Sequence, residues 1–126
     1  MRRVGPVQIQ IDNAVVYTAS TDGNFDVTDI FKKGQWVAPP TIFMKAVEDT
    51  NGSTLDIDFQ VSMDNGTTYK EVLSLTQLSA TGNELAAFTI PPWGEKVRMV
   101  VAVSGGGGQF TVSSWLAGQA AGAAGN

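Results

Sequence analysis

The chain has 126 residues, with 8 Lys and Arg against 12 Asp and Glu, so its formal net charge at pH 7 is −4. This is the length of one ordinary domain. The acidic balance argues against a nucleic-acid-binding surface, which requires clustered Lys and Arg. The sequence contains no Cys and no His. Disulfides, Cys/His zinc sites, Ser-His-Asp triads and Cys nucleophiles are therefore excluded.

The sequence shows no targeting or membrane segment. No apolar run approaches the roughly 18 residues that a membrane-spanning helix needs. Residues 1–6 include Arg2 and Arg3, but no apolar stretch follows them, so we expect no secretory signal. The lack of Cys fits assembly in a reducing cytoplasm, and we expect no membrane partner.

Alternation of apolar and polar residues with a period of two dominates the chain. The first run covers residues 7–11, and we expect a tight turn at Asp12 and Asn13 before a second run over residues 15–19. Residues 23–40 are less regular and predict a short strand or a turn of helix that begins at Thr28. The remaining predicted strands, separated by Gly-rich and Asn-rich turns, cover residues 42–47, 55–63, 69–75, 85–90, 96–103 and 109–115.

These runs predict an all-β fold, a single antiparallel β-sandwich or small barrel of about eight strands. The clearest strand, residues 55–63, places five apolar side chains on one face. We expect an N-terminal arm at residues 1–6, the β-sandwich domain at 7–116 and a flexible Gly/Ala-rich tail at 117–126. The tail offers too little apolar surface to offset the entropy of ordering, so it would order only on a partner.

Residues 62–69, SMDNGTTY, resemble the Asp-box, whose pattern is Ser/Thr-x-Asp-x-Gly-x-Thr-aromatic. We interpret the segment as a hairpin turn. Asp64 would cap backbone N–H groups, Gly66 would adopt a positive φ, and the ring of Tyr69 would fold back on the turn. The loop length predicts three facing pairs on the core side of the hairpin: Tyr69 with Met63, Leu73 with Phe59 and Leu75 with Ile57.

Two acidic residues on one strand, Asp56 and Asp58, lie roughly 7 Å apart by strand rise. That separation suits the carboxylate pair of a glycosidase. One of that pair must be kept protonated by burial, however, and these two point away from the core. We interpret them as a solvated pair, and we expect no catalytic residue and no enzymatic activity.

A second acidic group has the 1-3-5 spacing of a calcium loop: Asp22, Asn24 and Asp26. Val27 and Lys33 stand where an EF-hand requires Gly and Glu, so we interpret the segment as an Asx-rich turn. The glycines at 105–108 lack the Lys-Ser/Thr and helix of a phosphate-binding loop. We expect no metal and no cofactor.

Two Trp residues, Trp36 and Trp93, lie in predicted loops beside basic residues. Three interpretations remain open for them: a platform for stacking a sugar ring, anchors for a protein contact, or plugs at the end of the core. The strand at 96–103 is apolar on both faces, with Val100 and Ala102 directed outward. Because the outer face of a solvated sandwich is normally polar, we expect a neighbouring subunit or the chain's own ends to cover them.

The second half of the chain is similar to a known type of protein. Residues 54–118 resemble the small β-sandwich structural proteins of tailed-bacteriophage particles, through the DNG hairpin, the VRMVVAVSG strand, the Gly-rich tip and the closing FTVSSW strand. The resemblance implies a capsid decoration (cement) protein that binds and stabilises the lattice of the major capsid protein in the virion. It also implies a homo-oligomer, with the arm residues Arg2 and Arg3, the loop residues Trp36 and Trp93, and the strand residues Val100 and Ala102 as partner contacts.

Alternatives to the decoration protein are a tail, neck or fibre component, or a carbohydrate-binding or adhesive β-sandwich module. A binding module would be a monomer whose Trp fluorescence is quenched by a glycan.

Overall fold

The computed structural model describes residues 4–18, 20, 23–31, 35–36, 39–50, 52–87, 96–105 and 107–121. This part of the chain is nearly all strand, as the alternation predicts. The elements in chain order are β1 (Val4–Thr18), β2 (Gly23–Asp26), α1 (Thr28–Phe31), β3 (Gln35–Trp36), β4 (Thr41–Thr50), β5 (Ser53–Ser62), β6 (Lys70–Ser74), β7 (Gly82–Ala87), β8 (Lys96–Gly105) and β9 (Gln109–Ala121). No helix in these ranges has the length and apolar character needed to cross a membrane.

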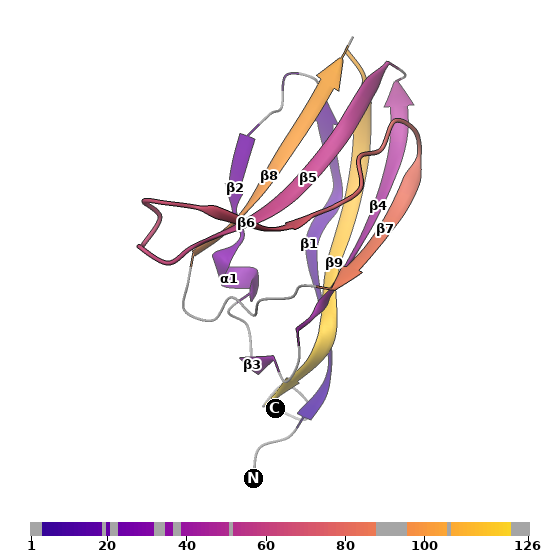
Figure 1. Cartoon of the computed structure of the whole chain (residues 1–126). Helices are drawn as coiled ribbons and strands as arrows, with labels where there is room; N and C mark the ends of the chain where they lie inside the picture. Colours follow the sequence, from indigo (N-terminus) through magenta and orange to yellow (C-terminus); the bar gives the residue numbers. More distant parts are fainter. Residues whose placement is uncertain are drawn as a thin grey trace.

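The strands form two antiparallel sheets that face each other (Figure 1). One sheet has the order β1-β9-β4-β7, with β3 added beside β9, and the other has the order β2-β8-β5-β6. If β3 is left aside and the other eight strands are renumbered consecutively, the orders become 1-8-3-6 and 2-7-4-5. This is the strand order of a jelly roll. The predicted sandwich is confirmed, in the open two-sheet form rather than as a closed barrel.

The core lies between the inner faces of the two sheets. The side chains of β5 alternate between buried and half-buried along the strand, and β8 has the same pattern. The largest fully buried side chains come from both sheets: Phe59, Phe110, Ile42, Met44, Leu55, Leu116, Val97, Val101 and Val103. The strand predicted over residues 42–47 is confirmed as part of β4, and the three side chains on one of its faces, Ile42, Met44 and Ala46, are buried.

The turn expected at Asp12 and Asn13 is wrong. β1 runs through these residues and stays paired with β9, with register shifts between Gln10 and Asp12 and between Asp12 and Val15. Ala14 takes up the extra length with φ 51°, and its N–H donates to the Ser113 hydroxyl at 3.1 Å. A bulge therefore bends one long strand where the sequence suggested two short ones.

The hairpin after β5 differs from its prediction in one register step. Leu73 lies opposite Phe59, and the Leu75 N–H donates to the Ile57 carbonyl at 2.9 Å, as predicted. A register shift follows between Phe59 and Gln60. β5 ends at Ser62, so Met63 is 78% exposed instead of joining the core. The same shift carries Tyr69 to the outer face, under Arg98.

Residues 23–31 contain both of the alternatives that the sequence left open, a short strand and then one turn of helix. The helix begins at Thr28, as predicted. The Thr28 N–H donates to the Asp26 carboxylate at 2.9 Å, and the Thr28 hydroxyl accepts from the Val97 N–H at 2.8 Å. These contacts fix α1 against β8.

The five-stranded sheet extends past both predicted domain boundaries. Residues 4–8 of β1 pair with residues 117–121 of β9, in register from Val4 opposite Ala121. β3 pairs with the same end of β9, with Trp36 opposite Ala120. The first residues of the predicted tail are therefore ordered by the chain's own N-terminal strand. In Figure 1 this ribbon continues beyond the body of the sandwich.

Candidate functional site

The predicted partner contacts do not gather at one place in the described part of the chain. Arg2, Arg3 and Trp93 lie outside the described residues. Trp36 belongs to β3, at the projecting end of β9. Val100 and Ala102 lie half-buried in β8 of the other sheet, opposite Asp58 and Asp56 of β5.

A row of side chains that the sequence analysis did not single out crosses the outer face of the five-stranded sheet. In register across β1, β9, β4 and β7 stand Gln10, Trp115, Phe43 and Leu85, which we call the aromatic row. Phe43 is 39% exposed and Leu85 is 69% exposed. The rings of Phe43 and Trp115 have centroids 5.7 Å apart and planes tilted by 41°. Large apolar groups thus occupy positions that water-facing strands usually give to polar residues.

A hollow of about 320 Å³ opens beside this row and is lined by Gln8, Phe43, Trp115 and Ala117. Gln8 and Ala117 are register partners one row away from the aromatic row. Among the described residues, two aromatic rings, one methyl group and one amide line the hollow, and none of these four carries a charge. Such a site suits a ligand with an apolar face and uncharged hydrogen-bonding groups.

The sequence contains part of the signal for this site. Phe43 alternates with the buried Ile42 and Met44, which already places it on the outer face. Its contact with Trp115 depends on the pairing of β4 with β9, and these strands are far apart in the chain. Residue order alone does not predict that pairing, because most sequential strands here lie in different sheets.

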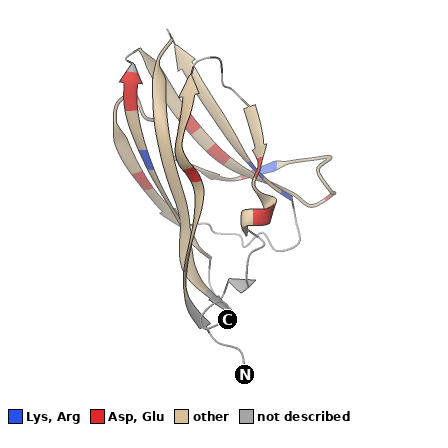
Figure 2. Cartoon of the chain, turned by 180° about the vertical axis from the view of Figure 1, so that it is seen from behind, with Lys and Arg blue, Asp and Glu red and all other residues tan. Residues whose placement is uncertain are grey.

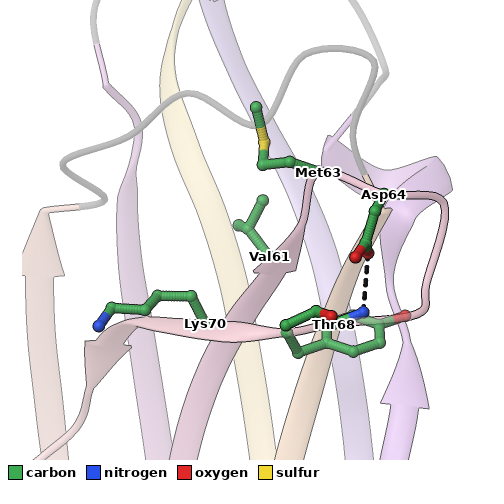
Figure 3. Close-up of a pocket in the computed structure, with 6 residues that line it drawn as sticks. Val61, Met63, Asp64, Thr68 and Lys70 are labelled. Atoms are coloured by element: carbon green, nitrogen blue, oxygen red, sulfur yellow. Dashed lines mark hydrogen bonds between the residues drawn. The ribbon is translucent and has the colours of Figure 1, made fainter.

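A second hollow, of about 310 Å³, lies at the hairpin between β5 and β6 (Figure 3). Asp64 is turned toward the hairpin backbone, where it accepts from the Thr68 N–H at 2.7 Å and the Ser62 hydroxyl at 2.8 Å. These bonds, the Thr68 N–H first, lower the pKa of Asp64. Gly66 has φ 92°, as predicted. The polar groups of the Asp-box-like segment are thus used to build the turn.

The two acidic residues of β5 are also held by hydrogen bonds. The Gln77 amide donates to both carboxylate oxygens of Asp56, at 3.1 and 2.9 Å, and the Ser74 hydroxyl donates to Asp58 at 2.7 Å. Both acids lie half-buried on the outer face of the four-stranded sheet. Their neighbours hold them as parts of a polar sheet surface.

The potential calcium ligands lie only partly within the described residues. Asp26 caps α1 through the Thr28 N–H, which matches the Asx-turn interpretation, while Asp22 and Lys33 lie outside the described residues. Within the described ranges, no three Asp or Glu residues come together in an arrangement able to hold a metal ion. Figure 2 shows acidic and basic positions scattered over a mostly uncharged ribbon.

One ionisable pair is buried at the bulge of β1. The Tyr17 hydroxyl donates to both carboxylate oxygens of Asp12 at 3.3 Å, and the residues are 3% and 7% exposed. Burial raises the pKa of Asp12, an effect that the Tyr17 hydrogen bond partly offsets. Burial and the nearby carboxylate raise the pKa of Tyr17. The pair fixes the bulge from inside the sandwich, away from solvent.

Comparison of the chain with protein-family models, curated proteins and solved structures finds no match.

Proposed function

We propose that this chain is a non-enzymatic structural protein of a tailed-bacteriophage virion, a capsid decoration protein that binds and stabilises the lattice of the major capsid protein. The resemblance of residues 54–118 to small β-sandwich virion proteins supports this proposal. The jelly-roll strand order agrees with it by analogy of fold, since capsid domains use this architecture. Lectin domains use it too, so the fold does not select the partner.

The observation that carries the proposal is the projecting ribbon, which we define as residues 4–8 of β1, residues 117–121 of β9 and the short β3 (Figure 1). Both ends of the described chain meet there. Arg2 and Arg3 precede this ribbon in the sequence, and Trp36 belongs to it. A rigid sandwich that carries both chain ends and a Trp on one projection can contact a lattice without rearranging its own core.

The proposed role is thermodynamic. A subunit that binds only the assembled shell stabilises the shell by mass action, in proportion to the logarithm of its free concentration over Kd. No catalytic group is needed for this. Asp56, Asp58 and Asp64 all accept hydrogen bonds from neighbouring residues, which favours a structural use of these acids.

The first test is a copy number. Quantitative mass spectrometry of purified particles of the encoding phage would count this chain against the major shell protein. A simple ratio to the shell subunit is the expected result. A handful of copies would instead assign the chain to the tail, neck or a fibre, and complete absence would overturn the virion proposal.

The second test addresses the projecting ribbon. Purified chain is added back to particles stripped of it, and binding is measured for the wild type, for Trp36→Ala and for Met63→Ala. Met63 is 78% exposed on the β5–β6 hairpin, away from the ribbon, and serves as the matched control. We expect Trp36→Ala to weaken binding at least tenfold and Met63→Ala to leave it unchanged. Equal binding by all three would remove the ribbon from the interface.

A further inference from the structure

The hollow beside the aromatic row adjoins the inner end of the projecting ribbon, to which Gln8 and Ala117 belong, and its chemistry points to a small ligand. Phe43 and Trp115 both line the hollow, and their ring planes are tilted by 41° to each other, so the two rings form its aromatic side. Gln8 stands beside these rings, and its amide supplies both donors and an acceptor. Gln10 continues the polar edge along β1, next to Trp115 in register.

The uncharged lining restricts the class of ligand. A phosphate, carboxylate or ammonium group would find no opposite charge among the lining residues that the structure describes, Gln8, Phe43, Trp115 and Ala117. The nearest charged neighbour on β4, Lys45, lies one row further along the sheet, opposite Ser113. A ligand that matches this lining has an apolar face for the rings and neutral hydroxyls for the amides.

A pyranose ring has both properties. The axial C–H groups make one face of the ring apolar, and its equatorial hydroxyls bond in the ring plane. We propose that the hollow binds a neutral carbohydrate, with one pyranose stacked on Trp115 and Phe43 and its hydroxyls bonded by Gln8. This assigns a ligand beyond the proposed function, a carbohydrate in addition to the shell protein. Its site overlaps the projecting ribbon at Gln8 and Ala117.

The row also argues against a protein occupant of the hollow. A protein interface of ordinary stability buries about 800 Å² on each partner around an apolar centre. Here the apolar row of Trp115, Phe43 and Leu85 is bordered by register neighbours such as Gln10, Thr41 and Ser113. The exposed Val16 and Val47 lie two rows away, on either side of Thr111. A narrow aromatic strip edged by amides and hydroxyls matches a sugar chain better than a second copy of this protein.

Isothermal titration calorimetry of the full chain tests the proposal. The probes are neutral hexasaccharides of glucose, mannose and galactose units in α and β linkage, with hexagalacturonate as the acidic comparison. We expect at least one neutral probe to bind and hexagalacturonate to bind more weakly. Absence of binding by every neutral probe would overturn the proposal.

Three variants locate the site. Trp115→Ala should weaken binding of the neutral probe at least tenfold, and Gln8→Ala should weaken it severalfold. Gln8 is exposed, so its truncation leaves the fold intact even if Trp115→Ala does not fold. Met63→Ala alters an exposed apolar side chain at the end of β5, in the other sheet, and should bind like the wild type.

Two outcomes of the variant series would overturn the site. One is unchanged binding in Gln8→Ala together with unchanged binding in a folded Trp115→Ala. The other is a concentration-dependent dimer, seen by light scattering and lost in Trp115→Ala, which would make the hollow an interface between copies. The copy number in particles is independent of both, so failure of the carbohydrate site and failure of the virion proposal are distinguishable.

Discussion

The two outer faces of the sandwich follow the same alternation but differ in chemistry. On the four-stranded sheet, Asp56, Asp58 and Arg98 face outward, and each is bonded by a neighbour. On the five-stranded sheet, the corresponding outward positions hold Phe43 and Trp115, which contact each other and leave ring surface open to solvent.

This difference separates the two faces by their chemistry. A face whose polar groups are paired along neighbouring strands is complete in water, since each group already has its partner. A face with exposed rings has unused apolar area, and such patches mark contact sites. The following experiments test this contrast, in order of decreasing expected effect.

We expect the largest difference in stability between variants of an inward phenylalanine, Phe59, and an outward one, Phe43. Phe59→Ala opens a cavity in the core and should lower the free energy of unfolding by about 3–5 kcal/mol. Phe43→Ala removes only a surface contact with Trp115 and should cost about 1 kcal/mol or less. Urea unfolding of both variants measures the two values. Equal losses would show that Phe43 belongs to the core, and the contrast between faces would fail.

The next effect concerns the turn that links the two sheets between β8 and β9. Gly105 has φ 115°, and a Cβ there would lie 2.5 Å from the Gly52 carbonyl oxygen. Gly105→Ala should destabilise the protein by about 1–3 kcal/mol from backbone strain, with the clash adding to this. Gly107 has φ 85° and open space around it, so Gly107→Ala is the matched control and should lower the free energy of unfolding by about 1 kcal/mol. Thermal unfolding of both compares them, and a larger loss for Gly107→Ala would contradict the geometry.

A smaller effect tests the pairing of side chains on the outer face of the four-stranded sheet. The Arg98 guanidinium lies 3.7 Å from the centre of the Tyr69 ring, and its Nε donates to the Gln60 side chain at 2.8 Å. A double-mutant cycle of Arg98→Met and Tyr69→Leu should give a coupling energy of about 0.5–1 kcal/mol. A second cycle, of Lys70→Met and Tyr69→Leu, serves as the control for this coupling energy. A coupling near zero for Arg98 would show that its stacking on Tyr69 contributes no stability.

The smallest effect is a difference in pH dependence between two acids. The pKa of buried Asp12 is raised. The contribution of Asp12 to the free energy of unfolding is therefore fully present below about pH 3.8 and is lost as the pH rises through the folded-state pKa. The pKa of Asp64 is lowered by its hydrogen bonds. The contribution of Asp64 to the free energy of unfolding is therefore present above about pH 3.8 and is lost as the pH falls through the folded-state pKa.

Asp12→Asn and Asp64→Asn, each compared with the wild type from about pH 3 to about pH 7, should therefore show slopes of opposite sign. The stability of the wild type relative to Asp12→Asn should fall as the pH rises, and that relative to Asp64→Asn should increase. Chemical unfolding at fixed ionic strength provides the measurement. Slopes of the same sign would mean that one of the two environments is misassigned.

Much of the fold is predictable from local pattern. The alternation in residues 42–47 and 55–61 correctly places Ile42, Met44 and Phe59 inside, because a strand presents successive side chains to opposite faces whatever its neighbours are. The turn chemistry of Asp64 and Gly66 is likewise local, since the capping bonds and the positive φ involve residues within one hairpin.

The candidate site is less predictable for the same reason. Trp115 and Phe43 become neighbours only when the last strand enters the sheet beside β4. The register shifts at Asp12 and after Phe59 are also set by packing. One inserted residue exchanges inner and outer faces, and the burial of the whole strand decides where that exchange is tolerated.

The sequence by itself determined the all-β class, an antiparallel sandwich or small barrel, the apolar faces of the main strands and the Asp64 turn, because each depends on patterns of residues close together in the chain. Only the tertiary structure decided the jelly-roll strand order, the pairing of the two chain ends, the bulge that buries Asp12 and the meeting of Phe43 with Trp115. These features depend on which distant strands pair, and that choice follows from burying the apolar faces of both sheets at once.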